Sequence, residues 1–231
     1  MEPAVYGMIT ATLGWCVLLL FVAWYFDFER KERLVSVATA FGFGISSVAI
    51  AASFEIFFSA LFDEFLLIVC VAPIVEEVCK LSSVAYFDGR MDELEDALVY
   101  SASVSLGFAF LENVIYIIGY YYELTIQELY TLTILRAILS VPAHIVACGL
   151  CATIYVYCRK FLHLETTESI FVSVLPGAVY HGMYNLVAIT GNVPLLMAYT
   201  GFGLLAYLAL WMYLRHLQHG HILPRENIFK L

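Results

Sequence analysis

Apolar residues gather along this chain in seven stretches, each longer than the ~20 residues that a helix needs to cross a bilayer. The stretches cover residues 5–26, 34–61, 64–87, 97–122, 131–158, 170–191 and 193–214. Short polar connections separate them, and no internal repeat, low-complexity tract or long hydrophilic region marks a second domain. The pattern predicts an all-α, polytopic membrane bundle of about seven transmembrane helices, forming one integral-membrane domain over residues 1–231.

Basic residues fall in every second connection of this pattern. The connections after the first, third and fifth stretches and the segment after the seventh contain Arg30, Lys31, Arg33, Arg90, Arg159, Lys160, Arg215, Arg225 and Lys230. The alternate connections contain no Lys or Arg. Because cytoplasmic loops are enriched in these residues, we expect the N-terminus outside and the C-terminus in the cytoplasm, which requires an odd number of spans.

Composition agrees with a membrane location. The chain is 62% hydrophobic and 13% charged, whereas a soluble domain is about 45–50% apolar and about 25% charged. The net charge of −9 argues against nucleic acid as a partner. The bilayer is therefore the expected surrounding of most of the chain.

Ionisable residues interrupt four of the apolar stretches close to one depth. Glu76 and Glu77 lie at the middle of the third stretch, His144 at the middle of the fifth and His181 at the middle of the sixth. Glu112 lies ~4 Å outward of the centre of the fourth. Each charge at a bilayer centre costs about 2.5–3.5 kcal/mol, so their coincidence in depth predicts a functional site within the membrane.

Neighbouring polar residues extend this candidate site. Lys80 follows the two glutamates by four and three residues, so it can pair with either carboxylate; a purely structural ion cluster is the alternative. Pro73 leaves the carbonyl of Val69 without its usual donor and is expected to disturb the helix there. Arg136, ~13 Å outward of the centre, either joins the site or extends to the membrane interface.

The spacing of these residues resembles that of a known family. The motifs are Glu76-Glu77-x-x-Lys80, Phe108-x-x-x-Glu112-Asn113, Arg136 with Pro142-x-His144, and His181-x-x-Tyr184-Asn185. In order and spacing they resemble the PrsW family of intramembrane proteases, which is related to the type II prenyl-protein (CAAX) endopeptidases and to the Aph subunit of gamma-secretase. The resemblance covers residues 64–191, the expected catalytic core. It implies cleavage of a membrane-anchored protein, such as a single-span protein, in the cell (cytoplasmic) membrane of a prokaryote.

Hydrolysis of a peptide bond requires a water, a base and donors for the oxyanion. The candidate catalytic residues are Glu76, Glu77, Lys80, Glu112, Asn113, His144, His181 and Asn185. In the mechanism favoured here Glu76 activates the water, and Glu77 or Lys80 tunes it. The two histidines position the water or protonate the leaving nitrogen, and Asn185 contributes to the oxyanion hole.

Whether a metal takes part is left open by the sequence. Two histidines and a glutamate suit a catalytic zinc ion with a free position for water, with Glu77, Glu112, His144 and His181 as candidate ligands. The zinc-dependent protease is therefore the alternative to a metal-free glutamate mechanism, which is slightly preferred. A non-catalytic membrane scaffold and a proton-coupled transporter are further alternatives.

Overall fold

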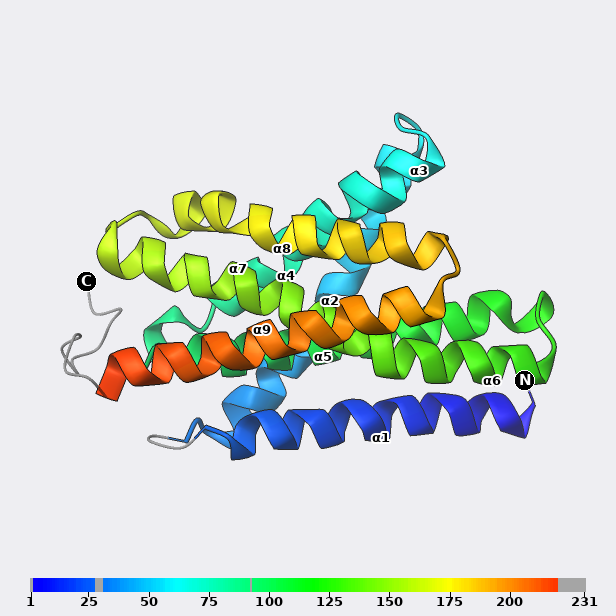
Figure 1. The fold of residues 1–231 in the computed structure, drawn as a ribbon, viewed down its shortest axis with the longest axis horizontal. Helices are drawn as coiled ribbons and strands as arrows, with labels where there is room; N and C mark the ends of the chain where they lie inside the picture. Colours follow the sequence, from blue (N-terminus) through cyan, green and yellow to red (C-terminus); the bar gives the residue numbers. More distant parts are fainter. Residues whose placement is uncertain (1, 28–30, 92, 220–231) are drawn as a thin grey trace.

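The computed structural model describes residues 2–27, 31–91 and 93–219 and contains only helices in these ranges. Seven helical rods cross the molecule (Figure 1), and three of them contain a second helical segment or turn. The rods are α1 (Pro3–Tyr25), α2 (Leu34–Ser59), α3 (Glu64–Leu66) with η1 (Leu67–Val71) and α4 (Ala72–Ala85), α5 (Asp96–Gly119) with η3 (Tyr120–Tyr122), α6 (Ile126–Leu135) with η4 (Arg136–Ser140) and α7 (Val141–Phe161), α8 (Thr166–Ile189), and α9 (Val193–His219). A short 3-10 turn, η2 (Asp88–Arg90), lies between α4 and α5.

Six of the rods in the described ranges are long and apolar enough to cross a membrane. They span Pro3–Tyr25, Leu34–Ser59, Asp96–Tyr122, Ile126–Phe161, Thr166–Ile189 and Val193–His216. The remaining rod, residues 64–85, carries Glu76, Glu77 and Lys80 within α4, which removes it from this group. The predicted all-α membrane bundle is confirmed, and the protein is an integral membrane protein.

Two helices begin earlier than predicted. The rod of α6 and α7 spans residues 126–161 instead of 131–158, and α8 starts at Thr166 instead of residue 170. A reciprocal capping box precedes each: Thr125 with Glu128 before α6, and Glu165 with Glu168 before α8. These side chains satisfy backbone N–H groups at the helix start, so polar residues outside the apolar stretches extend the helices.

Two rods change their winding just before a proline. The π-helical turn η1 precedes Pro73, and the π-helical turn η4 precedes Pro142. Proline has no N–H to donate to the carbonyl four residues earlier, and π turns inside α-helices are frequent at functional sites. The disturbance expected at Pro73 is therefore present. Glu76 follows the end of η1 by five residues and His144 follows the end of η4 by four, which is between one and one and a half helical turns.

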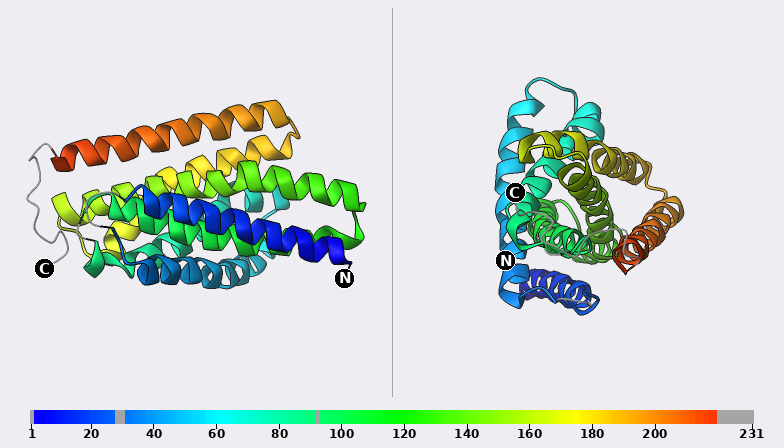
Figure 2. Two further views of the ribbon diagram at one scale, coloured as in Figure 1. Left: turned by 90° about the horizontal axis from the view of Figure 1, so that it is seen from below. Right: turned by 90° about the vertical axis from the view of Figure 1, so that its left-hand side faces the viewer.

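The centre of the bundle is α5, which packs against α1, α2, α4 and α7. Figure 2 shows α1 and α9 at the periphery when the bundle is viewed along its long axis. Gly44 of α2 lies on the backbone carbonyl of Val104, and Gly107 of α5 lies on that of Phe41. A Cβ at either glycine would overlap the opposite backbone, so this pair permits the close contact between α2 and α5.

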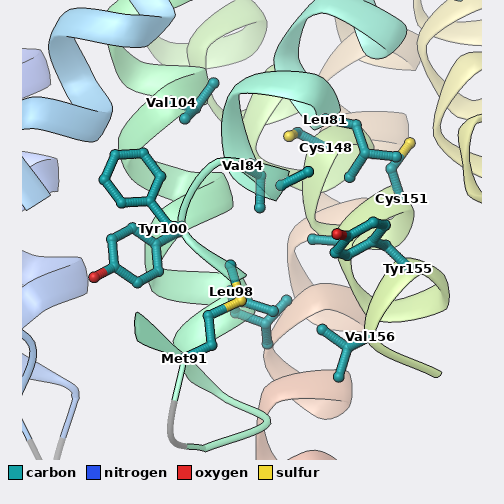
Figure 3. Packing of buried hydrophobic residues seen from close by; sticks show 14 of the residues in the cluster. Leu81, Val84, Met91, Leu98, Tyr100, Val104, Cys148, Cys151, Tyr155 and Val156 are labelled. Atoms are coloured by element: carbon teal, nitrogen blue, oxygen red, sulfur yellow. The ribbon is translucent and has the colours of Figure 1, made fainter. Parts of the chain in front are cut away.

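An apolar cluster fills one end of the bundle, where α4 and α7 end and α5 begins (Figure 3). Its members include Leu81, Val84, Met91, Leu98, Tyr100, Val104, Cys148, Cys151, Tyr155 and Val156. On α4 and α7 this cluster follows Lys80 and His144 directly in the sequence. The packed end therefore closes the bundle on one side of the candidate site.

Candidate active site

The ionisable residues predicted to share one depth come together in the structure. Glu76, Glu77 and Lys80 project from α4, Glu112 from α5, His144 from α7 and His181 from α8. Lys80 and Glu77 are fully buried, and Glu76, His144 and His181 are less than 8% exposed. The site is thus built from four separate helices and is shielded from solvent by the bundle.

A carboxylate and two imidazoles form the inner group of this site. The donor atoms of Glu76, His144 and His181 all lie within 4.8 Å of one another. Glu76 Oε2 lies 3.9 Å from Nδ1 of His144 and 3.8 Å from Nδ1 of His181. It has no hydrogen-bond partner although it is buried. The candidate metal ligands predicted from the sequence are Glu77, Glu112, His144 and His181. In the structure the group that could hold an ion combines the two histidines with Glu76, while Glu77 and Glu112 contact the histidines from outside this group.

Lys80 lies among the acids of the cluster. Its Nζ donates to Glu77 Oε1 at 2.5 Å and lies 3.6 Å from Glu76 Oε2. It also lies 3.0 Å from His144 Nδ1 and 4.6 Å from the ring centroid of Phe108. The predicted pairing of Lys80 with both glutamates is confirmed, and Phe108, one turn before Glu112, gives the ammonium an aromatic face.

The contacts of His144 define which of its ring nitrogens carries the proton. An ammonium only donates hydrogen bonds, so Nδ1 accepts from Lys80 and Nε2 bears the hydrogen. Nε2 then donates to Oε2 of Glu112 at 2.7 Å. Glu112 therefore orients this imidazole, so that its Nδ1 lone pair faces the inner group, as carboxylates do beside metal-binding histidines.

Glu77 plays the corresponding part for His181. Nδ1 of His181 lies 3.0 Å from Oε1 of Glu77, the oxygen that also accepts from Lys80. Because that oxygen belongs to a carboxylate in an ion pair, the imidazole donates to it. The two rings of His144 and His181 meet edge to face, with centroids 4.8 Å apart. Both glutamates of α4 thus lie near Lys80 and His181, but Glu77 makes the closer contacts, at 2.5 and 3.0 Å against 3.6 and 3.8 Å for Glu76, and fixes the position of both groups.

Arg136 belongs to the site and does not extend to the membrane interface. Its Nη2 lies 3.0 Å from Glu112 Oε1, and its Nε donates to Oδ1 of Asn113 at 2.6 Å. Its guanidinium stacks on the ring of Tyr116 at 3.5 Å from the centroid. Asn113 therefore contacts Arg136 and not the inner group, and Arg136 in turn fixes the position of Glu112.

Asn185 connects α8 to the π turn before Pro73. Its Nδ2 donates to the backbone carbonyl of Ile68 at 2.9 Å, which leaves its other N–H free of this bond. Gly182, on the same helix, lies on the carbonyl of Val69, the group that Pro73 leaves without its usual donor. A side chain at residue 182 would overlap this carbonyl. The role of Asn185 in an oxyanion hole stays a prediction.

A cavity of about 630 Å³ opens beside the cluster, on the side away from the apolar cluster. Glu76, His144 and His181 line its inner part, and Tyr120 and Gly191 line the part near the ends of α5 and α8. Glu77 and Lys80 are not among its lining residues. Of the adjacent glutamates, Glu76 is therefore the one that a molecule in the cavity meets.

Together, the helical bundle and its buried group of carboxylates and imidazoles define an integral membrane protein whose polar centre could hold a metal ion. Residues 30–214 match the family model described as PrsW family intramembrane metalloprotease, and the chain belongs to this family. The resemblance seen in the sequence is thereby confirmed. The family description includes a metal, which together with the group of Glu76, His144 and His181 favours the zinc-dependent alternative over the metal-free mechanism.

Curated relatives carry the name Protease PrsW. The one from Geobacillus kaustophilus is 33% identical over 117 residues, covering 49% of this chain and 48% of the relative. The one from Clostridioides difficile is 30% identical over 124 residues, covering 51% and 49%. The one from Bacillus subtilis is 32% identical over 103 residues, covering 44% and 43%. These alignments span about half the length of each relative, and no solved structure matches the chain.

Proposed function

We propose that this protein is an intramembrane metalloprotease that hydrolyses a peptide bond of a membrane-anchored protein, such as a single-span protein, in the cell membrane of a prokaryote. The observation that carries the proposal is the buried group of Glu76, His144 and His181 beside a cavity inside a membrane bundle. Membership of the PrsW family supports it independently.

The residues of the inner group fit a divalent ion such as zinc. One carboxylate and two imidazoles are a donor set of catalytic zinc sites, which keep a further position open. Glu76 Oε2 is buried without a hydrogen bond, as expected of an atom that awaits a ligand. Glu76, His144 and His181 would hold the ion. When bound, such an ion polarises a carbonyl and makes water acidic enough to act as a nucleophile near neutral pH.

The charges of the site tolerate a divalent ion. Glu76, Glu77 and Glu112 contribute −3 and Lys80 and Arg136 contribute +2, which leaves −1; a divalent ion changes the sum to +1. Either value is small for a buried cluster that also contains two neutral imidazoles. Lys80 lies close to Glu76, so its ammonium balances this carboxylate when no ion is present.

The chain's own residues arrange the reacting groups. Glu76 lines the cavity and contacts the reacting atoms, whereas Glu77 acts behind it by positioning Lys80 and His181. Glu112 keeps the Nδ1 lone pair of His144 turned inward. The second N–H of Asn185, which also lines the cavity, is available to a carbonyl oxygen of the substrate. The helices around the cavity exclude bulk water, which strengthens each of these interactions.

We further propose that all seven rods span the bilayer, with the N-terminus outside. The distribution of Lys and Arg supports this orientation. It places the apolar cluster at the cytoplasmic end of the bundle and the outer end of the cavity, lined by Tyr120 and Gly191, toward the outside. A substrate would then enter the cavity from the outer half of the membrane.

The test is cleavage by the full chain reconstituted with a single-span model protein, measured with and without a zinc chelator. We expect cleavage that the chelator abolishes and added zinc restores, and no cleavage by Glu76→Gln. Cys70→Ser changes an exposed thiol on the same rod. This variant is the matched control, and we expect it to retain activity. Binding of the model protein without cleavage, or proton flux without cleavage, would overturn the proposal.

A further inference from the structure

One wall of the cavity carries a carboxylate that the proposed mechanism does not use. Val48, Ala51, Ala52 and Glu55 of α2 line the cavity, and their spacing of three and four residues places them on one helical face. Val48 and Ala51 pack with Phe108, whose ring faces the Lys80 ammonium. This face of α2 therefore runs from the level of the inner group to Glu55.

The distance along this face corresponds to a few residues of substrate. Glu55 lies seven positions after Val48, which is ~10 Å along a helix axis. An extended peptide covers this distance in about three residues. The two alanines between them leave room for a side chain that lies along the wall.

Glu55 differs from the other charged residues of the cavity because it lacks a partner. Glu112 is paired with Arg136 at 3.0 Å, and Glu76 lies 3.6 Å from Lys80. In the part of the chain that the structure describes, no hydrogen bond or ion pair involves the half-buried Glu55 carboxylate. A charge in a membrane-spanning helix is normally paired or faces a wet cavity that it serves. A cationic group of a molecule bound in the cavity would give the Glu55 carboxylate the partner that it lacks.

We propose that Glu55 selects substrates that carry a Lys or Arg about three residues from the scissile bond, on the side that faces the outer end of the cavity. The apolar stem of such a side chain packs along Ala51 and Ala52, and its charged head pairs with Glu55, the arrangement usual for long basic side chains. This inference rests on the proposed protease function and names a class of substrate for it. Glu55 contacts the substrate but not the reacting peptide bond.

The experiment uses the full chain reconstituted with a Leu/Ala-rich single-span model protein, whose cleavage position is first mapped by mass spectrometry. Lys, Met or Glu is then placed at each of the five positions beyond the scissile bond toward the outer end of the cavity. At one of these positions we expect kcat/KM about tenfold higher for Lys than for Met, and lower for Glu than for Met.

Variants assign this preference to Glu55. Glu55→Gln should reduce the difference between Lys and Met to within about twofold, and Glu55→Lys should reverse the order so that Glu is preferred. Glu64→Gln, an exposed acid outside the cavity, should leave the preference unchanged. Circular dichroism and a melting curve of each variant verify that it is folded.

The outcomes separate the two proposals. Cleavage that ignores the charge of the substrate, or a Lys preference that persists in Glu55→Gln, overturns the inference about Glu55 and leaves the protease function standing. If the wild-type chain cuts none of the model proteins, the protease function fails, and the inference fails with it.

Discussion

Glu112 offers a direct test of how the site is held together, because it contacts both His144 and Arg136 but lies outside the inner group. In Glu112→Gln the carboxylate that accepts from Nε2 of His144 at 2.7 Å and pairs with Arg136 at 3.0 Å becomes a neutral amide. The amide can either accept from or donate to the imidazole, so it no longer fixes the tautomer of His144, and the guanidinium loses its counter-ion. We therefore expect weaker zinc binding and a lower free energy of unfolding.

The magnitudes follow from the contacts. Mutation of an outer carboxylate that orients a metal-binding histidine lowers metal affinity by about 10–100-fold, which is about 1.4–2.8 kcal/mol. Loss of one partner of a buried ion pair costs about 3–5 kcal/mol. Because the Glu112 side chain is 19% exposed, we expect the lower end, about 3 kcal/mol of unfolding free energy.

Zinc affinity of the purified protein, measured by competition with a chromophoric chelator, and a thermal melt test these numbers. His144→Ala is the reference for loss of a ligand, and Glu64→Gln is the control for loss of an exposed negative charge. If Glu112→Gln binds zinc as tightly as the wild type while His144→Ala does not, Glu112 does not orient the histidine and the reasoning is refuted.

Three further substitutions test other parts of the structure. Gly182→Ala introduces a Cβ that overlaps the backbone of η1. In thermal melts it should lower the free energy of unfolding by about 1–3 kcal/mol. Gly201→Ala is the control: this position has open space for a Cβ, so the change should be neutral or stabilising. Lys80→Met leaves buried acids without their cation and should lower the free energy of unfolding by about 3–5 kcal/mol. In a double-mutant cycle, the addition of Glu77→Gln should restore part of the lost stability. Burial raises the pKa of Asp88 in the folded protein despite its contacts with Tyr155 and Arg159, so the stability it contributes at low pH should be lost as pH rises through that pKa. Thermal melts at pH values from below to above this pKa should show a smaller decrease in stability for Asp88→Asn than for the wild type. An equal decrease in the two proteins would contradict this linkage.

The depth of the ionisable residues could be predicted from the sequence because helical rise is nearly constant. Counting residues from each span's centre placed Glu76, His144, His181 and Glu112 near one level, and the structure brings them into contact or near contact. Charges inside apolar stretches are costly enough that few arrangements satisfy them. The depth of the site could therefore be predicted from each helix separately.

The rotation of α4 about its axis could not be predicted in the same way. Glu76 and Glu77 differ by ~100° around the helix, and which one lines the cavity depends on how Leu81 and Val84 pack into the apolar cluster. This is a property of contacts between helices that are distant in sequence. It explains why the sequence named Glu77 among the candidate ligands, whereas in the structure Glu76 lies in the group that could hold an ion and Glu77 lies behind it.

The sequence left open whether Arg136 joins the site, because counting residues gives the depth of its backbone and not the reach of its side chain. Arg136 begins the π-helical turn η4, and its guanidinium contacts Glu112 and Asn113 of α5. An arginine side chain extends several ångströms from its Cα, so a backbone position nearer the helix end is compatible with these contacts. The spacing of Glu112 and Tyr116, one helical turn apart, was the signal in the sequence for a guanidinium site on that face of α5.

The central claim is that Glu76, His144 and His181 hold one divalent ion in the membrane interior. X-ray absorption at the zinc edge of the purified full-length protein tests it most directly. We expect one zinc per chain with nitrogen and oxygen ligands only, at about 2.0–2.2 Å, including two imidazoles, and loss of this spectrum in Glu76→Gln. Sulfur ligands at about 2.3 Å, or protein that cleaves its substrate while it contains no stoichiometric metal, would contradict it.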